Sequence, residues 1–486
     1  MTVSVERLAE AVLLPGFAGT SAPDWVLSRL AGGLGGVVLF GRNVVTDEQV
    51  GALCAQLRAT RPDVVVGIDE EGGDVTRLDA ATATRLPGPL ALGAAGDPRL
   101  TERAGSELGA RLAACGVTLD LAPCADLALT PDDPIIGVRA FGSDPHTAAA
   151  HVAAYVRGLQ GHGVAACAKH FPGHGASTSD SHHELPVLPR TAGQLHAVEL
   201  VPFRAAIAAG VRSVMTGHLV VPEWGPDAAT VNATAIRTVL RGELGFTGTV
   251  VTDALEMGAL AGRLGDARGL ASAAVRALKA GADALCVGGE VSDAEAVAAV
   301  VDAIVAGVRT GELTEERLAE AAERTRALGA PPTGGPWTED PELGMAIARR
   351  ALRTRGLPAL SGGPLVLDVE VAPTIVAGPV PWGLGAHVRE LAPLTEVVRV
   401  DPVDPGAVVE LAAARGEVVV ATRDAHRHPE VAALVRALVA AVPVVVQVET
   451  GVPGADLGAT GRVDTFGASW SSLRAAAEAV VTASAP

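Results

Sequence analysis

The sequence predicts an α/β protein: a (β/α)8 barrel of the TIM type, followed by a smaller αβ sandwich domain. Short apolar runs alternate with amphipathic helical stretches over the first two thirds of the chain. The runs are apolar throughout and rich in β-branched residues, which is typical of parallel strands that helices cover on both faces. Eight strand–helix units are what such a barrel requires. The eight runs cover residues 11–14, 36–40, 64–69, 117–122, 164–169, 211–216, 249–253 and 283–287.

Polar residues follow the carboxyl ends of most of these predicted strands. Asp69, Asp126, His170, His218 and Asp253 all stand at or shortly after such an end. A barrel gathers these ends around one rim, where barrel enzymes place their active sites, whereas an open sheet spreads them along an edge. The pattern therefore favours the barrel over a doubly wound sheet, which is the alternative topology.

A Pro/Gly-rich segment divides the chain. Residues 329–337 read GAPPTGGPW, a composition typical of a linker between domains. We expect a catalytic barrel at 1–328, a linker at 329–339 and an αβ sandwich domain at 340–486. In that last part, four more parallel-type strands alternate with helical stretches, at residues 365–371, 396–400, 418–422 and 444–448.

Composition excludes several classes of protein. The formal net charge of −17 argues against nucleic acid as a partner, because phosphate binding needs a basic surface. No apolar run reaches the roughly 18–20 residues of a membrane helix, and Glu6 and Glu10 stand where a signal peptide carries positive charge. The five cysteines are odd in number and form no CxxC pair, which indicates reduced thiols. We expect a cytoplasmic protein without a membrane partner.

The densest group of polar residues lies at 169–186, with the sequence KHFPGHGASTSDSHHELP. A metal site is one interpretation, since His170 and His174 are four residues apart. However, Pro172 and Gly173 prevent the helix that would align them, and no HExxH motif or cysteine partner is present. A Schiff-base lysine is another, because Lys169 ends a predicted strand. The residue pattern alone leaves both alternatives open, and the sequence requires no metal or organic cofactor.

Several separated motifs resemble glycoside hydrolase family 3, in particular its β-N-acetylglucosaminidase branch. The segment DEEGG at 69–73 is similar to the family's DQEGG, with Glu70 in place of Gln. Asp74 stands where many members have Arg, which we expect to matter little because Arg77 is retained. The other matching motifs, in sequence order, are APCAD at 122–126, IGVRAFG at 136–142, KHFPGHG at 169–175, DSHHELP at 180–186, MTGH at 215–218 and VTDALEM at 251–257.

The resemblance implies roles for individual residues. Asp253 would be the nucleophile that forms a covalent glycosyl-enzyme. A histidine, His182, would take the place of the second carboxylate as acid/base, oriented by Asp180. An imidazole with a pKa near ~6.5 can donate and accept a proton close to neutrality. Five further residues would bind the sugar hydroxyls: Asp69, Arg139, Lys169, His170 and, with less support from the motifs, His174.

The function that this pattern predicts is that of a retaining, exo-acting β-N-acetylglucosaminidase. It would release terminal N-acetylglucosamine from a carbohydrate partner such as a muropeptide or chitin fragment. A phosphorylase is one alternative, because a neutral histidine would not repel inorganic phosphate as a carboxylate does. A β-glucosidase of the same family is another, although such enzymes resemble a pattern with a Glu acid/base in the second domain and without the histidine loop. A non-catalytic sugar-binding barrel is the alternative from a different class.

Overall fold

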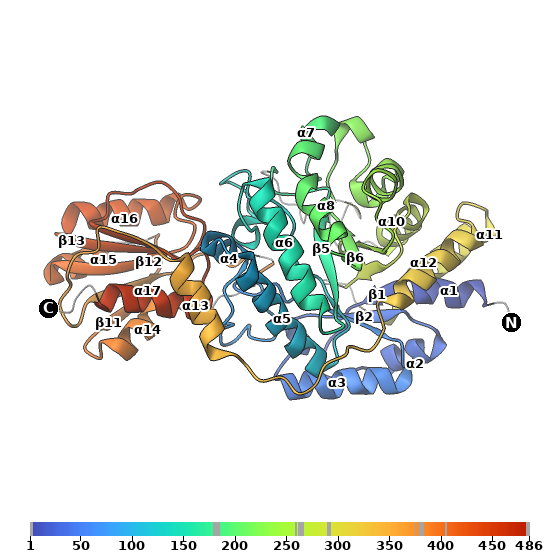
Figure 1. Cartoon of the computed structure of the whole chain (residues 1–486), viewed down its shortest axis with the longest axis horizontal. Helices are drawn as coiled ribbons and strands as arrows, with labels where there is room; N and C mark the ends of the chain where they lie inside the picture. The colour runs from blue at the N-terminus through green and yellow to red at the C-terminus, as the bar shows by residue number, and fades with distance from the viewer. Residues whose placement is uncertain are drawn as a thin grey trace. The chain divides into compact units, whose positions relative to one another are not determined.

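The computed structural model describes residues 3–177, 185–257, 260, 267–288, 293–374, 376–378, 383–403 and 406–482. The chain divides into two compact units, and each is described by itself (Figure 1). The first unit consists of Met1–Glu71, Thr101–Leu127 and Ser143–Glu339. The second consists of Gly72–Leu100, Ala128–Gly142 and Asp340–Pro486, so it takes two segments from the earlier part of the chain. The linear division into 1–328, 329–339 and 340–486 stays a prediction about domains.

Eight parallel strands form the centre of the first unit and follow one another in chain order. β2 to β7 form one six-stranded ladder, and β1 pairs with β8. A bridge between Val251 and Ala284 links β7 to the segment leading into β8, and β1 contacts β2. The strand order is the one predicted for a (β/α)8 barrel. The strands are β1 (Leu13–Pro15), β2 (Gly36–Leu39), β3 (Val65–Ile68), β4 (Leu119–Asp120), β5 (Ala165–Phe171), β6 (Ser213–Thr216), β7 (Thr249–Thr252) and β8 (Leu285–Val287).

Apolar side chains from these strands meet in one core, which is what curls the sheet. Every strand contributes to this core, for example Leu14 from β1, Val65 from β3 and Cys286 from β8. A curled parallel sheet filled by small and branched side chains is the arrangement of barrel proteins. The α/β class and the eight predicted strands are therefore confirmed.

Helices cover the outside of the strands in the first unit (Figure 1). Two of them, α5 (Pro98–Cys115) and α6 (Pro145–Gln160), pack with their backbones unusually close. A Cβ atom on Gly158 would lie 2.1 Å from the carbonyl oxygen of Glu102, so only glycine fits there. The other helices include α1 (Val5–Ala11), α2 (Asp24–Gly32), α3 (Asp47–Thr60), α7 (Ala192–Ala197), α8 (Leu200–Ala208), α10 (Ala267–Ala280), α11 (Ala294–Arg309) and α12 (Glu315–Ala327).

The second unit is built on a six-stranded sheet in the order β11-β10-β12-β13-β14-β9, in which only β9 is antiparallel to its neighbour. The strands are β9 (Arg353–Arg355), β10 (Leu365–Val369), β11 (Glu396–Val400), β12 (Glu417–Thr422), β13 (Val444–Glu449) and β14 (Gly461–Asp464). Short helices α4 (Pro89–Ala95) and α13 (Pro341–Ala351) complete this unit together with the helices that cover the sheet.

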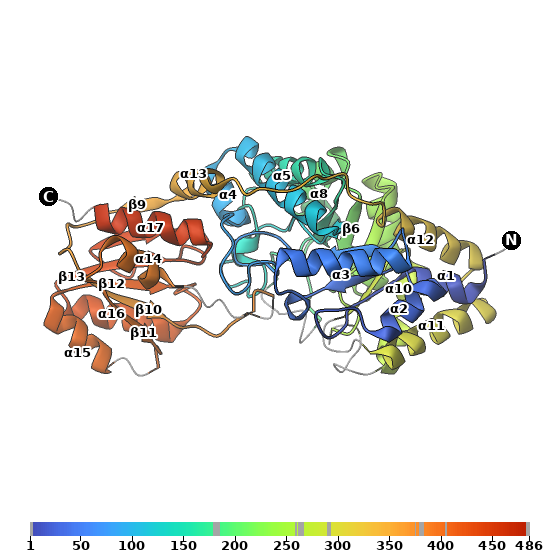
Figure 2. The same ribbon diagram turned by 90° about the horizontal axis from the view of Figure 1, so that it is seen from below.

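Helices lie on both faces of this sheet, as Figure 2 shows. α14 (Leu384–Leu391) and α17 (Trp470–Thr482) pack against one face, where Val366 and Val419 point. α15 (Gly406–Arg415) and α16 (Pro429–Ala441) pack against the other, where Leu365 and Val418 point. Successive strand residues thus serve opposite cores, which confirms the predicted αβ sandwich.

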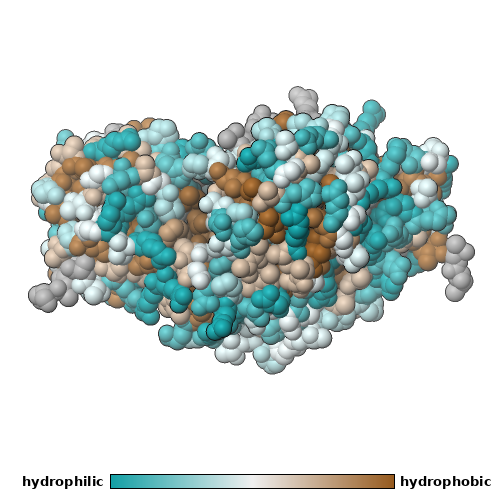
Figure 3. Space-filling model, turned by 45° about the horizontal axis from the view of Figure 1, so that its top comes forward, coloured by the Kyte–Doolittle hydropathy of each residue, from teal (hydrophilic) through white to brown (hydrophobic). Residues whose placement is uncertain are grey.

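The surface carries few large exposed apolar side chains among the described residues. Those exposed include Val45 in the first unit and Leu394 and Val403 in the second. Figure 3, which shows one face of the molecule, has hydrophilic and hydrophobic residues interleaved. Within the described part of the chain, no helix has the length and hydropathy to cross a membrane.

Candidate active site

The predicted functional residues of the first unit gather at the carboxyl ends of its strands, which are called the rim below. Asp69 follows β3, Lys169 and His170 lie near the end of β5, His218 follows β6 and Asp253 follows β7. Neighbouring parallel strands end on the same side, so the fold brings these side chains to one edge of the sheet. Asp180 and His182 lie outside the described residues.

Lys169 is a buried cation held between two carboxylates. Its Nζ lies 2.7 Å from Oδ1 of Asp69 and 2.7 Å from Oε1 of Glu71. The side chains of Lys169 and Glu71 are 3% and 0% exposed, while that of Asp69 is 19% exposed. Two carboxylates stabilise the ammonium form, whereas Schiff-base chemistry needs the neutral amine. The contacts therefore favour a lysine that positions Asp69 over a nucleophilic lysine.

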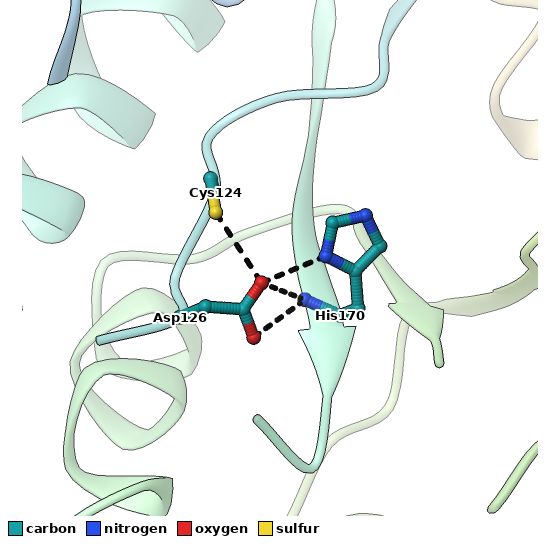
Figure 4. A group of neighbouring side chains, drawn as sticks. All are labelled: Cys124, Asp126 and His170. Atoms are coloured by element: carbon teal, nitrogen blue, oxygen red, sulfur yellow. Dashed lines mark hydrogen bonds and ion pairs between the residues drawn. The ribbon is translucent and has the colours of Figure 1, made fainter. Parts of the chain in front are cut away.

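Asp126 is the hub that holds His170 and the turn after β5 (Figure 4). Its Oδ2 lies 2.7 Å from Nδ1 of His170, and its carboxylate also accepts the backbone N–H of His170 at 3.1 and 3.2 Å. The backbone N–H of His174 donates to Oδ1 at 2.7 Å. These bonds fix the ring of His170, with Nδ1 as the donor. They also require a carboxylate that stays ionised.

The electrostatics of Asp126 are consistent with that requirement. Burial alone would raise the pKa of this carboxyl group, since it disfavours the charged form. The charge and hydrogen bond of His170, together with those of His174, outweigh burial and lower the pKa of Asp126 to about 2. Asp126 belongs to the APCAD motif of the sequence, but no role was predicted for it. The APCAD motif at residues 122–126 marks Asp126 as a candidate site residue, but its contact with His170 arises only when the chain folds.

Cys124, Asp126 and His170 are the three described side chains whose donor atoms could hold a metal ion, because these atoms lie within 4.8 Å of one another. Figure 4 shows that the atoms converge on a carboxylate oxygen. Oδ2 of Asp126 accepts from Sγ of Cys124 at 3.3 Å and from Nδ1 of His170 at 2.7 Å. An ion would have to break these hydrogen bonds. The group is therefore complete as a hydrogen-bonded cluster, and we place no cation there.

A second buried carboxylate supports the segment 69–71. Oδ1 of Asp120, at the end of β4, accepts the backbone N–H of Glu70 at 3.0 Å. The hydroxyl of Tyr155 donates to the carbonyl oxygens of Glu70 and Glu71, each at 3.3 Å. Burial raises the pKa of Asp120 well above its usual value. Asp120 and Tyr155 thus hold the backbone on which Asp69 stands, and sequence reasoning missed both.

Asp253 occupies the turn directly after β7. Its backbone N–H donates to the carbonyl of Thr216 at 3.1 Å, and its Oδ1 accepts the N–H of Ala254 at 2.8 Å. His218 supports the same turn, since its Nε2 donates to the carbonyl of Ala254 at 2.9 Å and its Nδ1 contacts the hydroxyl of Thr230 at 2.8 Å. Asp253 as a whole is only partly buried.

The remaining predicted sugar-binding residues are His174 and Arg139. His174 belongs to the first unit and is 2% exposed, with its ring 6.4 Å from that of His170 in an edge-on arrangement. Arg139 belongs to the second unit, where it is 5% exposed and donates to the carbonyl of Ile135 at 3.2 Å. Asp69, Lys169, His170 and His174 therefore all belong to the first unit, whereas Arg139 belongs to the second.

Glu449 bears on the alternative of a β-glucosidase, which would use a Glu of the second domain as acid/base. This residue ends β13 and is 1% exposed. Its carboxylate accepts the backbone N–H of Asp424 at 2.7 Å, that of Gly451 at 2.9 Å and the hydroxyl of Thr422 at 3.0 Å. Burial, together with Asp424, raises its pKa. The hydrogen bonds of Glu449 therefore join loops of the second unit. This is a structural role, not that of an acid/base.

Comparison with known proteins gives matches over both parts of the chain. The family described as "Glycosyl hydrolase family 3 N terminal domain" matches residues 23–328. A β-hexosaminidase of Stenotrophomonas maltophilia is 40% identical over 259 residues, which are 51% of this chain and 76% of that protein. A β-N-acetylhexosaminidase structure from Beutenbergia cavernae is 30% identical, with a TM-score of 0.59, and covers 68% of this chain and 99% of its own.

A further solved structure matches almost the whole chain. It is a glycoside hydrolase family 3 β-N-acetylglucosaminidase from Paenibacillus sp. strain FPU-7, 31% identical with a TM-score of 0.90. The match covers 99% of this chain and 97% of that one. The second unit, and not only the strands of the first, is therefore shared with that protein.

Proposed function

The chain is a glycosidase that belongs to glycoside hydrolase family 3, and we propose that it is a retaining, exo-acting β-N-acetylglucosaminidase. Its substrates would be glycoconjugates with a terminal N-acetylglucosamine, such as muropeptide or chitin fragments. The observation that carries the proposal is the partly buried Asp253 at the carboxyl end of β7, on the same rim as the Lys169–Asp69 and His170–Asp126 pairs. Support for the sugar comes from relatives that are named for hexosamines.

In the proposed mechanism, Asp253 attacks the anomeric carbon and forms a covalent glycosyl-enzyme. His182, oriented by Asp180, protonates the leaving oxygen and then removes a proton from the incoming water. The roles of both residues are inferred from the DSHHELP motif at residues 180–186 of the sequence. A histidine suits the task because its ordinary pKa lies near the pH at which it must both give and take a proton.

The rim residues would bind the sugar. Asp69 is held in place by Lys169, and His170 by Asp126, so each presents a charged or polarised group with a fixed orientation. Charge-assisted hydrogen bonds to hydroxyl groups are stronger than neutral ones, which suits recognition of a polar ring. Arg139 and His174 are also proposed to bind the sugar, and only the sequence motifs support their roles.

Turnover on a panel of nitrophenyl β-glycosides tests the proposed function. The expected result is a kcat/KM for the β-N-acetylglucosaminide at least about 100-fold above that for the β-glucoside, since a site built around one polar substituent rejects analogues that lack it. A preference for the β-glucoside would overturn the assignment of the sugar. No turnover on any glycoside would favour the sugar-binding barrel.

Water is the proposed acceptor, and inorganic phosphate is the second candidate. The sequence keeps phosphate as an alternative, because a histidine in its neutral form, such as His182, would not repel an anion as a carboxylate does. The charge of Lys169 adds little attraction, because Asp69 and Glu71 compensate it at 2.7 Å each. Turnover with and without millimolar phosphate decides the matter: N-acetylglucosamine 1-phosphate as product would show a phosphorylase, and free sugar in both cases a hydrolase.

A cytoplasmic location is part of the same proposal. All five cysteines are buried thiols, and burial raises the pKa of Cys54, Cys115 and Cys167 to about 12. Such thiols are unreactive and compatible with a reducing compartment. Fractionation of cells that express the tagged protein tests the location.

A further inference from the structure

Glu199 is a buried carboxylate of the first unit to which the proposed mechanism gives no part. It stands directly before helix α8, and its side chain is 2% exposed. Its Oε1 accepts the Nε–H of Arg190 at 2.8 Å, whereas its Oε2 has no hydrogen-bond partner among the residues that the structure describes. Because a buried charge is costly when it is unpaired, breaking this ion pair should affect the residues that pack around Glu199.

Arg190 fastens the stretch of chain that follows the DSHHELP motif. Pro186 closes that motif, and its carbonyl accepts the backbone N–H of Val220 at 2.8 Å. The N–H of Leu188 donates to the carbonyl of Val220, also at 2.8 Å. This stretch therefore runs beside the segment that follows β6. The guanidinium group of Arg190 then joins its end to Glu199.

The turn that precedes the motif packs on the same carboxylate residue. Gly173, in the segment KHFPGHG, has a φ of +124°, and a Cβ atom placed on it would lie 2.9 Å from Cβ of Glu199. The turn therefore lies so close to Glu199 that only glycine fits there. The N–H of Gly173 donates to the carbonyl of His170 at 2.8 Å, and that of His174 donates to Asp126 at 2.7 Å. These bonds fix the turn from within.

Glu199 thus contacts the chain on both sides of the DSHHELP motif. Gly173 comes before the motif in the sequence, and Arg190 comes after it. Asp180 and His182 therefore stand between two stretches of chain that meet at Glu199. A general acid must come within about 2.6–3.2 Å of the atom that it protonates. An error of about 1 Å in such a position can cost roughly 100-fold in rate, even when the change that causes it is remote.

We propose that Glu199 and Arg190 are positioning residues for the acid/base His182. They touch no sugar and transfer no proton; they hold the two stretches of chain between which the motif stands. This inference rests on the proposed function, in which His182 protonates the leaving oxygen. A purely structural role is the alternative, because a carboxylate directly before α8 also interacts favourably with the dipole of that helix. A structural carboxylate affects every substrate alike, whereas a positioning pair acts on the step that needs the acid.

Kinetics of the full-length protein on two substrates separate these roles. Nitrophenyl β-N-acetylglucosaminide has a leaving group that needs little protonation, whereas the leaving hydroxyl of a chitin disaccharide needs a general acid. Glu199→Gln removes the charge at constant size, Arg190→Met removes the guanidinium group, and Arg190→Lys keeps the positive charge. Glu243→Gln is the matched control, since Glu243 is an exposed carboxylate that pairs with His196 of α7 at 2.9 Å. Urea unfolding checks that every variant is folded.

Glu199→Gln and Arg190→Met should each lower kcat/KM about 10- to 100-fold for the disaccharide but less than about threefold for the aryl glycoside. Arg190→Lys should recover most of this loss, and Glu243→Gln should match the parent. The double variant should lose no more than either single one, because both changes break the same contact.

Equal losses on both substrates, additive losses in the double variant, or an unchanged kcat/KM for the disaccharide would overturn the proposal. If Glu199→Gln does not fold, the two Arg190 variants decide the matter, since that side chain is 33% exposed. Absence of turnover on both substrates in the parent protein would instead overturn the proposed function.

Discussion

Asp74 and Arg423 form a buried ion pair that joins two distant segments of the second unit. Oδ1 of Asp74 also accepts the N–H of Ala468 at 2.7 Å, so both carboxylate oxygens are used. Burial alone would lower the pKa of Arg423, but the carboxylate of Asp74 outweighs it and raises that pKa. The departure from the family's Arg at position 74 was expected to matter little. The structure instead gives Asp74 a buried partner, Arg423, from a distant segment of the same unit.

Removing one partner of this pair should destabilise the protein strongly. Arg423→Met leaves the charge of Asp74 buried and uncompensated, which costs roughly 3–5 kcal/mol of unfolding free energy. The double variant Asp74→Asn with Arg423→Met removes the charge but keeps an acceptor for Ala468, and should recover at least half of the loss. Urea unfolding of both variants measures this. Equal losses in the single and double variants would show that the ion pair is not the cause.

Asp126 should link stability to pH in the acid range. Its pKa in the folded protein is about 2, below the ordinary value of 3.8. Its contribution is therefore fully present above pH 4 and disappears as the pH falls from about 4 to 2. The difference corresponds to about 2 kcal/mol. Asp126→Asn should lose this part of the pH dependence, as measured by unfolding at pH 6 and pH 3. A variant with the pH dependence of the parent would contradict it.

The same variant should also affect catalysis, because Asp126 fixes the ring of His170. Loss of a hydrogen bond to a charged group costs about 1.5–3 kcal/mol, or roughly tenfold to 100-fold in kcat/KM. If His170 binds the sugar equally in the ground state and the transition state, the change should appear mainly in KM. Unchanged kinetics would remove His170 from the proposed sugar-binding group.

Asp253→Ala should lower kcat by about 10⁴-fold or more, as expected for the loss of a nucleophile. Asp227→Ala is the matched control, since Asp227 is an exposed carboxylate that pairs with Arg276 at 2.7 Å. It should retain full activity. Trapping with a slow 2-fluoro sugar and peptide mass mapping identifies the labelled residue directly. A label on Asp69 or Asp126 would rule out Asp253 as the nucleophile.

His182→Ala should discriminate between leaving groups. A nitrophenolate leaves with little protonation, whereas a sugar hydroxyl needs a general acid. The variant should therefore lose roughly 10²–10⁴-fold on a chitin disaccharide and much less on an activated aryl glycoside. In the parent, kcat/KM should fall as the pH rises above the pKa of the histidine, and this limb should be absent from the variant. Equal losses on both substrates would argue against an acid/base role.

Strands were more predictable than contacts in this protein. β5, for example, was expected at residues 164–169 and is found at Ala165–Phe171, because a buried parallel strand imposes a continuous apolar pattern on its own sequence. Asp69, Lys169 and His170 were likewise expected at strand ends. The roles of Asp120, Asp126 and Tyr155 were not foreseen. Each acts through a partner 44 or more residues away, and such pairing leaves no local pattern in a single sequence.

The composition of the second unit has a consequence for how the chain folds during synthesis. Residues 72–100 and 128–142 leave the ribosome well before residues 340–486, with which they form one compact unit. At about 5–20 residues per second, the early segments wait on the order of ten seconds to a minute for their partners. During that interval the backbone of helix α4 lacks Arg350, which donates to the carbonyl of Ala95 at 2.7 Å in the finished protein. Nascent chains halted before residue 340 should thus be captured by chaperones more than completed ones.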